Sequence, residues 1–386
     1  MMNLLDNISN GDFEEVGTKT LDLKGETNTY KTYRIPLDML KYNRKNDRIA
    51  SFMTEIEATN QDITEDKIES FIFDSAPADN KKTMANIKAT RQRESAVVMS
   101  DGTVIDGNRR FTCLRKLSRE TNDDKYGHII AVVLDKSKYE DKDVKKLELQ
   151  IQNLEEKVSY NPIDRYVGVY RNLMAENKEF TISEYAQDSN QSVGKVQDDI
   201  IMAGIMIDFL DFIGKPLQFN FAREQKLDGT LNEMKKIVKS KGMDEERKQA
   251  IKETCFSAFM SGYDSKKIRS LIDSCKNDKV FTEDKINDAK KINAETYQSF
   301  HDDGYLNKET KQSVSDFSKD IIEEFALSKE KNKEEKLVDV ALNNISKVDI
   351  DDVNHMSSEL KSNFINKLNQ LKDKVDNLSE FINAKR

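Results

Sequence analysis

The sequence predicts an N-terminal α+β region followed by an all-α region, in a chain that is mostly helical overall. The segments that resemble strands all lie before residue 135, and from Lys138 onward apolar residues recur at helical spacing. The 386 residues include only 4 Pro and 14 Gly, and 34% of them are charged, a composition that favours helices. A chain of this length suggests two or three domains.

The first strand is expected at Thr29–Ile35, after a polar segment, residues 1–28, that we expect to be a flexible arm. Two helices should follow, at Ile49–Thr59 and Ile63–Ser75, and Thr64 is a suitable N-cap for the second. The basic segment Lys81–Arg93 comes next and can also be helical.

A β-hairpin and a helix are predicted around residues 96–117. Ala96–Met99 and Thr103–Ile105 are apolar or β-branched runs, and Asp101-Gly102 between them predicts a type I′ turn with φ > 0 at both positions. Asp106-Gly107-Asn108 ends the second strand, and a helix then begins with two arginines, Arg109 and Arg110. Cations in a first helical turn oppose the helix dipole, so a bound anion would offset their cost. The segment therefore predicts a phosphate-binding site.

The rest of the chain is predicted to be helical after one more strand, Tyr126–Leu134. Pro162 suits the first position of a helix. A short helix near residues 180–186, a polar turn and a longer helix from Ser192 to Asp208 have a helix-turn-helix outline. Near the end, apolar residues are spaced 4-3-4-3-4, which is a heptad seam that favours self-association: Phe364, Leu368, Leu371, Val375, Leu378 and Ile382.

Charge and composition exclude several classes of protein. A net charge of −8 and an isoelectric point near 5.3 argue against a non-specific nucleic-acid coat, although a local basic patch remains compatible with them. The three cysteines are far apart and odd in number, as expected for a protein of the reducing cytoplasm rather than one with a disulfide framework. No apolar run approaches the length of about 20 residues that a membrane span requires, so no membrane partner is expected.

Three segments resemble, in order, those of the ParB/sulfiredoxin-fold family. Asp106–Arg110 is similar to its G-x-R-R box, and Arg34–Leu37 with Asn43–Arg48 resembles its opening strand and short arginine-containing box. Gln152–Glu155 and Tyr160–Ile163 are similar to the ParB segment E-N-I-Q … L-N-P-I, with one residue inserted. The helix-turn-helix outline lies where ParB-type proteins carry theirs, so the resemblance covers roughly residues 29–213.

The resemblance implies a small mixed sheet with helices that binds a nucleoside triphosphate, CTP or ATP, and Mg²⁺. Gly107, Arg109 and Arg110 would hold phosphates, with Asn108 in the same box and Arg44 or Arg48 as the arginine of the first box. Asn153 and Glu155, or Glu156 given the insertion, would contact phosphate or Mg²⁺ and serve any hydrolysis. Carboxylate and amide oxygens suit Mg²⁺.

Two departures from the family limit the expected chemistry. Asn108 stands where sulfiredoxins carry their nucleophilic Cys and where ParB proteins carry a Glu. Sulfinic-acid reduction is therefore disfavoured, and binding of a nucleotide without rapid turnover becomes plausible. The expected recognition helix has one lysine, Lys195, against two aspartates, so the basic tracts that contain Arg91, Arg93 and the arginines of residues 109–119 are better candidates for DNA contact.

The leading hypothesis is a cytoplasmic ParB-like switch or clamp, nucleotide-dependent, DNA-associated and homodimeric, from a plasmid, phage or other mobile element, with a slow triphosphatase step. The alternatives are a ParB-like metal-dependent nuclease, with Asp106, Glu155 and Glu156 as its carboxylates, and an adaptor whose acidic helical tail binds a protein. The expected organisation is a nucleotide-binding domain and three helical parts after the arm, with these bounds: 29–137, 138–215 (helix-turn-helix-like), 216–350 (charged) and 351–386 (heptad helix).

Overall fold

The structure is a computed structural model that describes residues 3–59, 62–154, 161–331 and 333–384. The chain divides into two compact units, Met1–Ile321 and Ile322–Arg386, and the boundary between them falls inside helix α15 (Lys308–Lys331). The domain boundaries expected after residues 137 and 215 do not separate compact units, because the sheet and the helices that follow it belong to the same unit.

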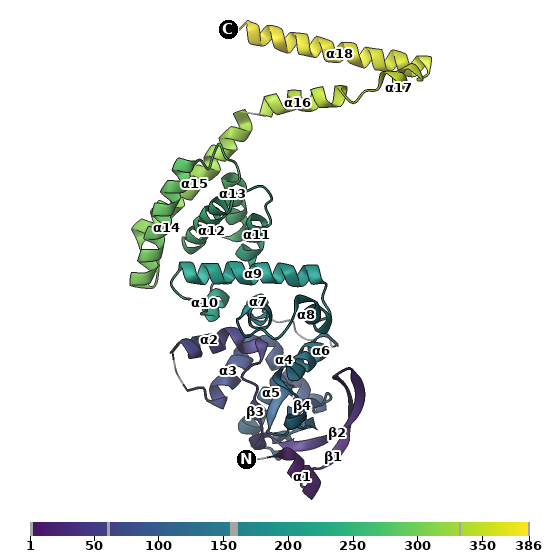
Figure 1. Ribbon diagram of the computed structural model, residues 1–386, viewed down its shortest axis with the longest axis vertical. Helices are drawn as coiled ribbons and strands as arrows, with labels where there is room; N and C mark the ends of the chain where they lie inside the picture. Colours follow the sequence, from purple (N-terminus) through teal and green to yellow (C-terminus); the bar gives the residue numbers. More distant parts are fainter. Residues whose placement is uncertain (1–2, 60–61, 155–160, 332, 385–386) are drawn as a thin grey trace. The chain divides into compact units, whose positions relative to one another are not determined.

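Six strands of the first unit form one mixed sheet in the order β1-β2-β6-β4-β5-β3. Figure 1 shows this sheet with β1, β2, β3 and β4 labelled. Neighbouring strands are antiparallel except for two parallel pairs, β4 with β6 and β3 with β5. The predicted fold class, a small mixed sheet with helices followed by an all-α region, is confirmed. The strands are β1 (Glu15–Leu23), β2 (Glu26–Pro36), β3 (Lys41–Tyr42), β4 (Ala96–Met99), β5 (Thr103–Asp106) and β6 (His128–Leu134).

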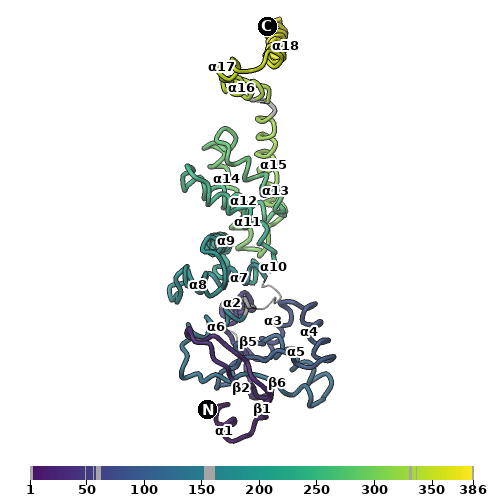
Figure 2. Tube along the Cα trace, turned by 90° about the vertical axis from the view of Figure 1, so that its right-hand side faces the viewer, coloured from purple at the N-terminus to yellow at the C-terminus, as the bar shows by residue number. Residues whose placement is uncertain are grey.

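Helices cover both faces of this sheet (Figure 2). Side chains alternate along β4, so that Val97 and Met99 pack with Leu147 and Ile151 of α6 (Asp141–Leu154), while Val98 faces the opposite core. That second core includes buried side chains of α3 (Glu65–Ser75), α4 (Pro77–Thr90) and α5 (Asn108–Thr121). The continuous apolar runs of β4 and β6 are explained by this burial on both sides.

The expected flexible arm, residues 1–28, is wrong. Helix α1 (Leu4–Asn10) precedes β1, and the buried Leu4 donates its backbone N–H to the Ser100 carbonyl at 2.8 Å. Leu21 and Leu23 of β1 point into the core beside α6. This strand has only two such inward residues, so its alternation was too weak to be recognised in a polar segment.

The hairpin between β4 and β5 is confirmed, but its predicted turn type is wrong. Gly102 has φ +84°, whereas Asp101 is not among the residues with positive φ, so the turn is not type I′. The loop has three residues, Ser100–Gly102, and the β4–β5 pairing has a register shift between Val97 and Val98, as in hairpins that carry a bulge. The Asp101 carboxylate accepts hydrogen bonds from the Thr103 N–H at 3.1 Å and from Lys136 Nζ at 2.6 Å, and these contacts hold its pKa well below the usual range against the opposing effect of burial.

The helical part of the first unit contains the predicted helix-turn-helix outline. Helix α8 (Ile182–Asp188) and helix α9 (Val193–Phe212) are joined by a short turn, and α8 begins with a capping box between Thr181 and Glu184. Pro162 opens α7 as predicted. The other helices of this unit are α2 (Ala50–Thr59), α7 (Pro162–Val169), α10 (Phe219–Glu224), α11 (Asp228–Val238), α12 (Glu245–Met260), α13 (Ser265–Cys275) and α14 (Glu283–Asp303).

A buried ion pair joins the sheet region to these helices. The Asp164 carboxylate, at the start of α7, accepts hydrogen bonds from the Ser51 hydroxyl of α2 and from Arg223 of α10. Burial raises the pKa of Asp164, and the Arg223 guanidinium opposes that shift. The guanidinium also lies 4.5 Å from the centre of the Phe52 ring. Because Asp164 is buried, its charge depends on these partners.

The second unit is helical and leaves much apolar surface exposed. It contains α16 (Lys333–Ile345), α17 (Ile350–Asn354) and α18 (Ser358–Asn383), and α18 has no buried residue. The predicted heptad seam lies on α18, which confirms the helix. None of the helices among the described residues is long and apolar enough to cross a membrane.

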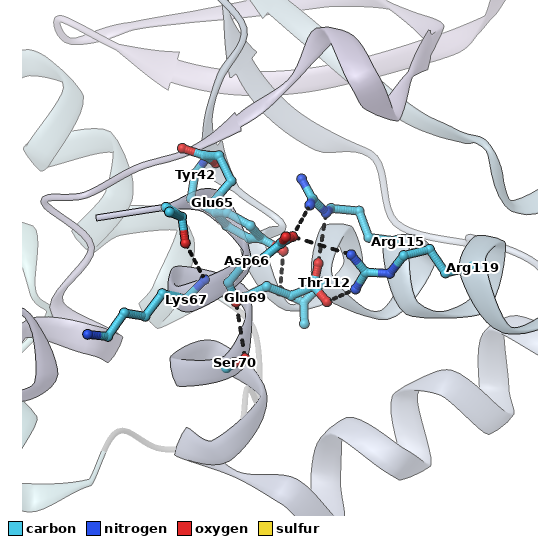
Figure 3. A network of polar contacts seen from close by, with 10 residues as sticks. Tyr42, Glu65, Asp66, Lys67, Glu69, Ser70, Thr112, Arg115 and Arg119 are labelled. Atoms are coloured by element: carbon cyan, nitrogen blue, oxygen red, sulfur yellow. Dashed lines mark hydrogen bonds and ion pairs between the residues drawn. The ribbon is translucent and has the colours of Figure 1, made fainter. Parts of the chain in front are cut away.

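Arginines near the C-terminal end of α5 connect it to α3 through a buried carboxylate (Figure 3). Arg115 Nε donates to Glu69 Oε2 at 2.8 Å, and Arg119 pairs with the other oxygen of Glu69. Asp66 accepts further bonds from both arginines but remains 78% exposed, whereas the Glu69 side chain is 4% exposed. Tyr42 links β3 to the same place through a 2.9 Å bond between its hydroxyl and that of Thr112.

We expect Glu69→Gln to lower the free energy of unfolding by about 1–3 kcal/mol, because Arg115 and Arg119 lose charge-assisted hydrogen bonds to a buried carboxylate. The matched control is Asp66→Asn, which removes a charge from the same network at an exposed position and should cost about 0.5 kcal/mol or less. Urea unfolding of both variants measures the difference. Equal losses in the two variants would contradict a special role for the buried carboxylate.

Candidate functional site

The two arginine-containing segments that resemble family boxes lie at one edge of the sheet. Strands β3 and β5 are parallel neighbours, with Lys41 opposite Thr103 and Tyr42 opposite Val104. Their carboxyl ends therefore meet at the same edge, where Asn43 continues from β3 and Gly107 continues from β5. Residues that are more than 60 positions apart in the chain are brought together by this pairing.

Gly107 is required at the junction between β5 and α5. Its φ of +97° is strained for any other residue, and a Cβ atom there would lie 2.8 Å from the Ala96 Cβ. Gly107 is also the N-cap of α5, and having no side chain it supplies no capping hydrogen bond. The first turn of α5 contains no acidic residue. This geometry resembles helix starts that bind anions through backbone N–H groups.

Asn108 is turned into the protein. It is buried, and its amide nitrogen donates to the Val104 carbonyl at 3.0 Å and to the Ile105 carbonyl at 3.4 Å. These bonds tie the start of α5 back onto β5. Its Oδ1 is buried and has no hydrogen-bond partner among the described residues. Asn108 therefore has a structural role that the sequence did not predict.

Arg110 is held by neighbouring groups of the protein. It forms an ion pair with Asp106 at 3.3 Å, one helical turn earlier, and hydrogen-bonds to the Glu94 carbonyl. Lys19 of β1 lies 3.8 Å from the same Asp106 carboxylate. Arg110 is thus a bridge between β5, α5 and the segment before β4, and Asp106 is engaged by two cations rather than set apart for metal binding.

Arg109 is half-buried at the start of α5, with its Nε and Nη2 atoms shielded from solvent. The thiol of Cys113, one turn later, is fully buried, and burial raises its pKa to about 12, although the Arg109 charge partly opposes the shift. Such a thiol stays protonated and is a poor nucleophile. The buried Cys113 agrees with the expectation that sulfinic-acid reduction is disfavoured.

Arg44 lies beside two cavities that share a wall. Its guanidinium donates to the Ile63 carbonyl at 3.1 Å. One cavity of about 450 Å³ extends toward β5 and the start of α6, and another of about 470 Å³ extends toward Arg171. Arg44, Lys45, Asp141 and Lys145 line both of them, whereas Gly107, Asn108, Arg109 and Arg110 line neither.

A buried cluster of three charged residues, which the sequence analysis missed, completes this edge. Lys145 Nζ of α6 lies 2.5 Å from Asp47 Oδ2 and 3.1 Å from Glu148 Oε2, and all three side chains are at most 12% exposed. A Cβ atom on Gly168 would lie 2.9 Å from Asp47 Oδ2, so α7 closes over the cluster. The only sequence signal was a Lys and a Glu three apart on the inward face of an amphipathic helix.

The cluster has one ammonium for two carboxylates, and one of these carboxylates has a strongly raised pKa. Burial raises the pKa of Glu148 to about 7, against the opposing effect of Lys145 and with smaller contributions from Asp47 and Asp106. Burial alone would lower the pKa of Lys145, but Asp47 and Glu148 outweigh it and hold that pKa above its usual value. One carboxyl of the cluster therefore retains its proton until near neutral pH.

Several predicted residues lie outside the described part of the structure. These are Glu155 and Glu156, together with the side chains of Arg48 and Asn153. The backbone of α6 is described to Leu154, so the helix that carries Lys145 and Glu148 leads toward them. Among the described residues, no group of three His, Cys, Asp or Glu side chains is arranged to hold a metal ion.

The DNA-contact candidates fall into two different environments. Lys195, at the start of α9, is neutralised by Asp199 at 2.6 Å, and Asp199 also pairs with Arg165 at 3.1 Å. Arg91 and Arg93 are exposed at the end of α4. The recognition helix was predicted to carry one lysine against two aspartates, and the structure shows that this lysine is also paired.

Comparisons with known proteins find similarity to solved structures. No family model matches the chain, and no curated protein matches it. A solved structure described as the C2221 form of a Pnob8-like ParB-N domain aligns with 57% of this chain and 88% of its own, at 12% sequence identity. Its TM-score of 0.28 is too low for the alignment to support an argument about this chain.

We expect Glu148→Gln to change how stability depends on pH. The carboxyl of the folded wild type has its pKa raised from 4.5 to about 7, so folded protein retains a proton that the unfolded chain releases. The stability from this group is present below pH 4.5 and is lost as the pH rises to 7, by at most about 1.4 kcal/mol per pH unit. Glutamine, which is always neutral, should remove that loss.

Urea unfolding at a series of pH values measures this effect as the difference between the variant and the wild type. That difference should shift in favour of the variant between pH 4.5 and 7 and then level off. The control is Glu120→Gln, a replacement of an exposed carboxylate on α5. Parallel profiles for wild type and Glu148→Gln would contradict a raised pKa at this position.

Proposed function

We propose that this chain is a ParB-like switch that associates with DNA and responds to a nucleoside triphosphate, CTP or ATP, together with Mg²⁺. The observation that carries the proposal is the meeting of two arginine-containing segments at the carboxyl ends of the parallel strands β3 and β5. At that edge a left-handed glycine opens helix α5, whose first turn contains no acidic residue.

The chemistry of this edge suits the phosphates of a nucleotide. Free N–H groups at a helix start and nearby guanidinium groups are common phosphate ligands, because both complement negative charge. Arg109 and Arg44 are the cations that we assign to phosphate contact. Arg110, which is engaged by Asp106 and Glu94, would position the start of α5 rather than provide the principal phosphate contact.

The metal ligands and the hydrolytic group remain proposals from the family resemblance. Asn153 and Glu155 would hold Mg²⁺, which supplies charge neutralisation for the phosphates. Glu155 or Glu156 would serve a slow triphosphatase step that resets the switch. The placement of α6 supports this assignment, since its Lys145 contacts Asp47 of this edge and also pairs with Glu148.

Replacement of Arg109 by Ala should abolish stabilisation by nucleotide with little loss of fold. The assay is thermal unfolding of the whole chain with Mg²⁺ and each of CTP, ATP, GTP and UTP. A ligand at 100 times its dissociation constant stabilises the wild type by about 2.7 kcal/mol. The control is Lys116→Ala, which removes a cation two turns later on α5, over the Phe73 ring. If no nucleotide stabilises the wild type, the nucleotide part of the proposal fails.

The heptad seam supports a homodimer through α18. Four of its six apolar positions, among them Leu368 and Leu378, are more than 40% exposed, so this face is available to a second copy. In a parallel pair, Lys367 at position g would face Lys372 at position e of the other chain. These like charges weaken the association at low salt.

We expect the dimer to become stronger as salt concentration rises, because screening reduces the lysine repulsion. Sedimentation velocity at several salt concentrations measures this. The double variant Leu371→Asp and Leu378→Asp should be monomeric. The control, Gln370→Glu and Asn377→Asp, adds the same charge one position before each leucine, off the apolar stripe, and should leave the dimer intact. A monomeric wild type at all salt concentrations would refute self-association through this seam.

A further inference from the structure

Helix α4 and the segment after it present an exposed basic surface. It is formed by Lys81, Lys82, Lys88, Arg91 and Arg93, and we call it the α4 basic surface. No acidic residue occurs between positions 81 and 93. Within the described parts of the chain, none of these five cations has a carboxylate oxygen within the 4.0 Å that defines an ion pair.

Several cations on the neighbouring elements form ion pairs instead. On α5, which packs against α4, Arg115 and Arg119 pair with Glu69, and Arg110 pairs with Asp106. On the expected recognition helix α9, Lys195 pairs with Asp199. In a chain with a net charge of −8, the α4 basic surface is therefore a local concentration of uncompensated positive charge.

The fold holds this surface in place. Asn80 donates to the carbonyls of Ile72 and Phe73 at 2.9 and 2.7 Å, which anchors the start of α4 to the end of α3. At the other end, the Gln92 amide donates to the Ile130 carbonyl at 2.7 Å and accepts from the Ile130 N–H at 2.8 Å. Arg91 and Arg93 thus flank a residue that is fixed to the backbone of β6.

The length and spacing of the surface match a nucleic-acid backbone. From Lys81 to Arg91, a helical rise of 1.5 Å per residue spreads the cations over about 15 Å. A DNA duplex presents about nine phosphate charges over that distance. The other exposed polar side chains of α4 include Asn86 and Thr90, whose amide and hydroxyl groups are of the kind that contact phosphate oxygens.

The same composition argues against a membrane surface as the partner. Helices that lie in a lipid interface present an apolar face with large side chains. No large exposed apolar side chain occurs on α4, whose Met84 and Ile87 are buried in the core. A polyanion without an apolar component fits this surface better.

We propose that the α4 basic surface, rather than the recognition helix α9, contacts the phosphate backbone of a nucleic-acid duplex. The inference rests on the proposed association with DNA and assigns the surface that carries it. Contact of this kind depends on charge and is independent of base sequence.

The test is fluorescence anisotropy of the whole chain with a DNA duplex of mixed sequence at a series of salt concentrations. The triple variant Lys81→Gln, Lys82→Gln and Lys88→Gln should bind more weakly, and the slope of log K against log salt should fall by about 2.7, or 0.9 for each lost phosphate contact. The matched control is Lys266→Gln, Lys279→Gln and Lys311→Gln, three exposed lysines on other surfaces. The control should leave the slope unchanged.

Equal weakening in the two triple variants, or a loss confined to Lys195→Gln, would overturn the α4 assignment while leaving DNA association intact. A wild type that binds no duplex would refute both the assignment and the proposed association with DNA. Binding of the wild type to phosphatidylserine vesicles, without any binding to a duplex, would refute them as well. If the wild type also binds an RNA duplex, and the triple variant binds it more weakly to the same extent as DNA, the result would support backbone contact. RNA would then be an equivalent source of phosphates.

Discussion

The close approach of Gly107 to Ala96 is the contact on which the candidate site depends. Because a Cβ at position 107 would lie 2.8 Å from the Ala96 Cβ, the chain can turn from β5 into α5 at this point only without a side chain. The turn places the start of α5 at the edge where β3 also ends. Asn108 and Arg110 then fix the helix start by bonds to β5 and to the segment before β4.

Buried carboxylates determine which cations of the first unit remain available. Glu69 forms ion pairs with two arginines of α5, and Asp106 forms one with Arg110. Lys145 pairs with both Asp47 and Glu148. The sequence shows a series of basic residues from 81 to 119, but it does not show which of them are paired. Ion pairs hold Arg110, Arg115 and Arg119 of α5 in structural roles. The exposed cations of α4 have no such pairs among the described residues, so they can contact a partner.

Local signals explain what the sequence analysis predicted correctly. The N-cap of α3 at Thr64, the start of α7 at Pro162 and the strands of the hairpin all depend on a few adjacent residues. The elements that were missed depend on distant partners. Strand β1 exists because it pairs with β2, and the cluster of Asp47, Lys145 and Glu148 exists because the segment after β3 meets α6 and α7. The type of the turn at Asp101 was predicted wrongly because the dipeptide Asp101-Gly102 is also compatible with a three-residue loop in a hairpin that carries a bulge.

The charge balance of the edge also limits how it could receive an anion. Burial raises the pKa of Glu148 to about 7, and a phosphate placed beside the cluster would add a negative charge that raises this pKa further. Arg44 and Arg109 would have to compensate the phosphate charge, while the cluster retains its proton. Proton uptake and anion binding would then favour each other, because each reduces the electrostatic cost of the other. An edge with these groups is suited to a switch, since its protonation and its occupancy would change together.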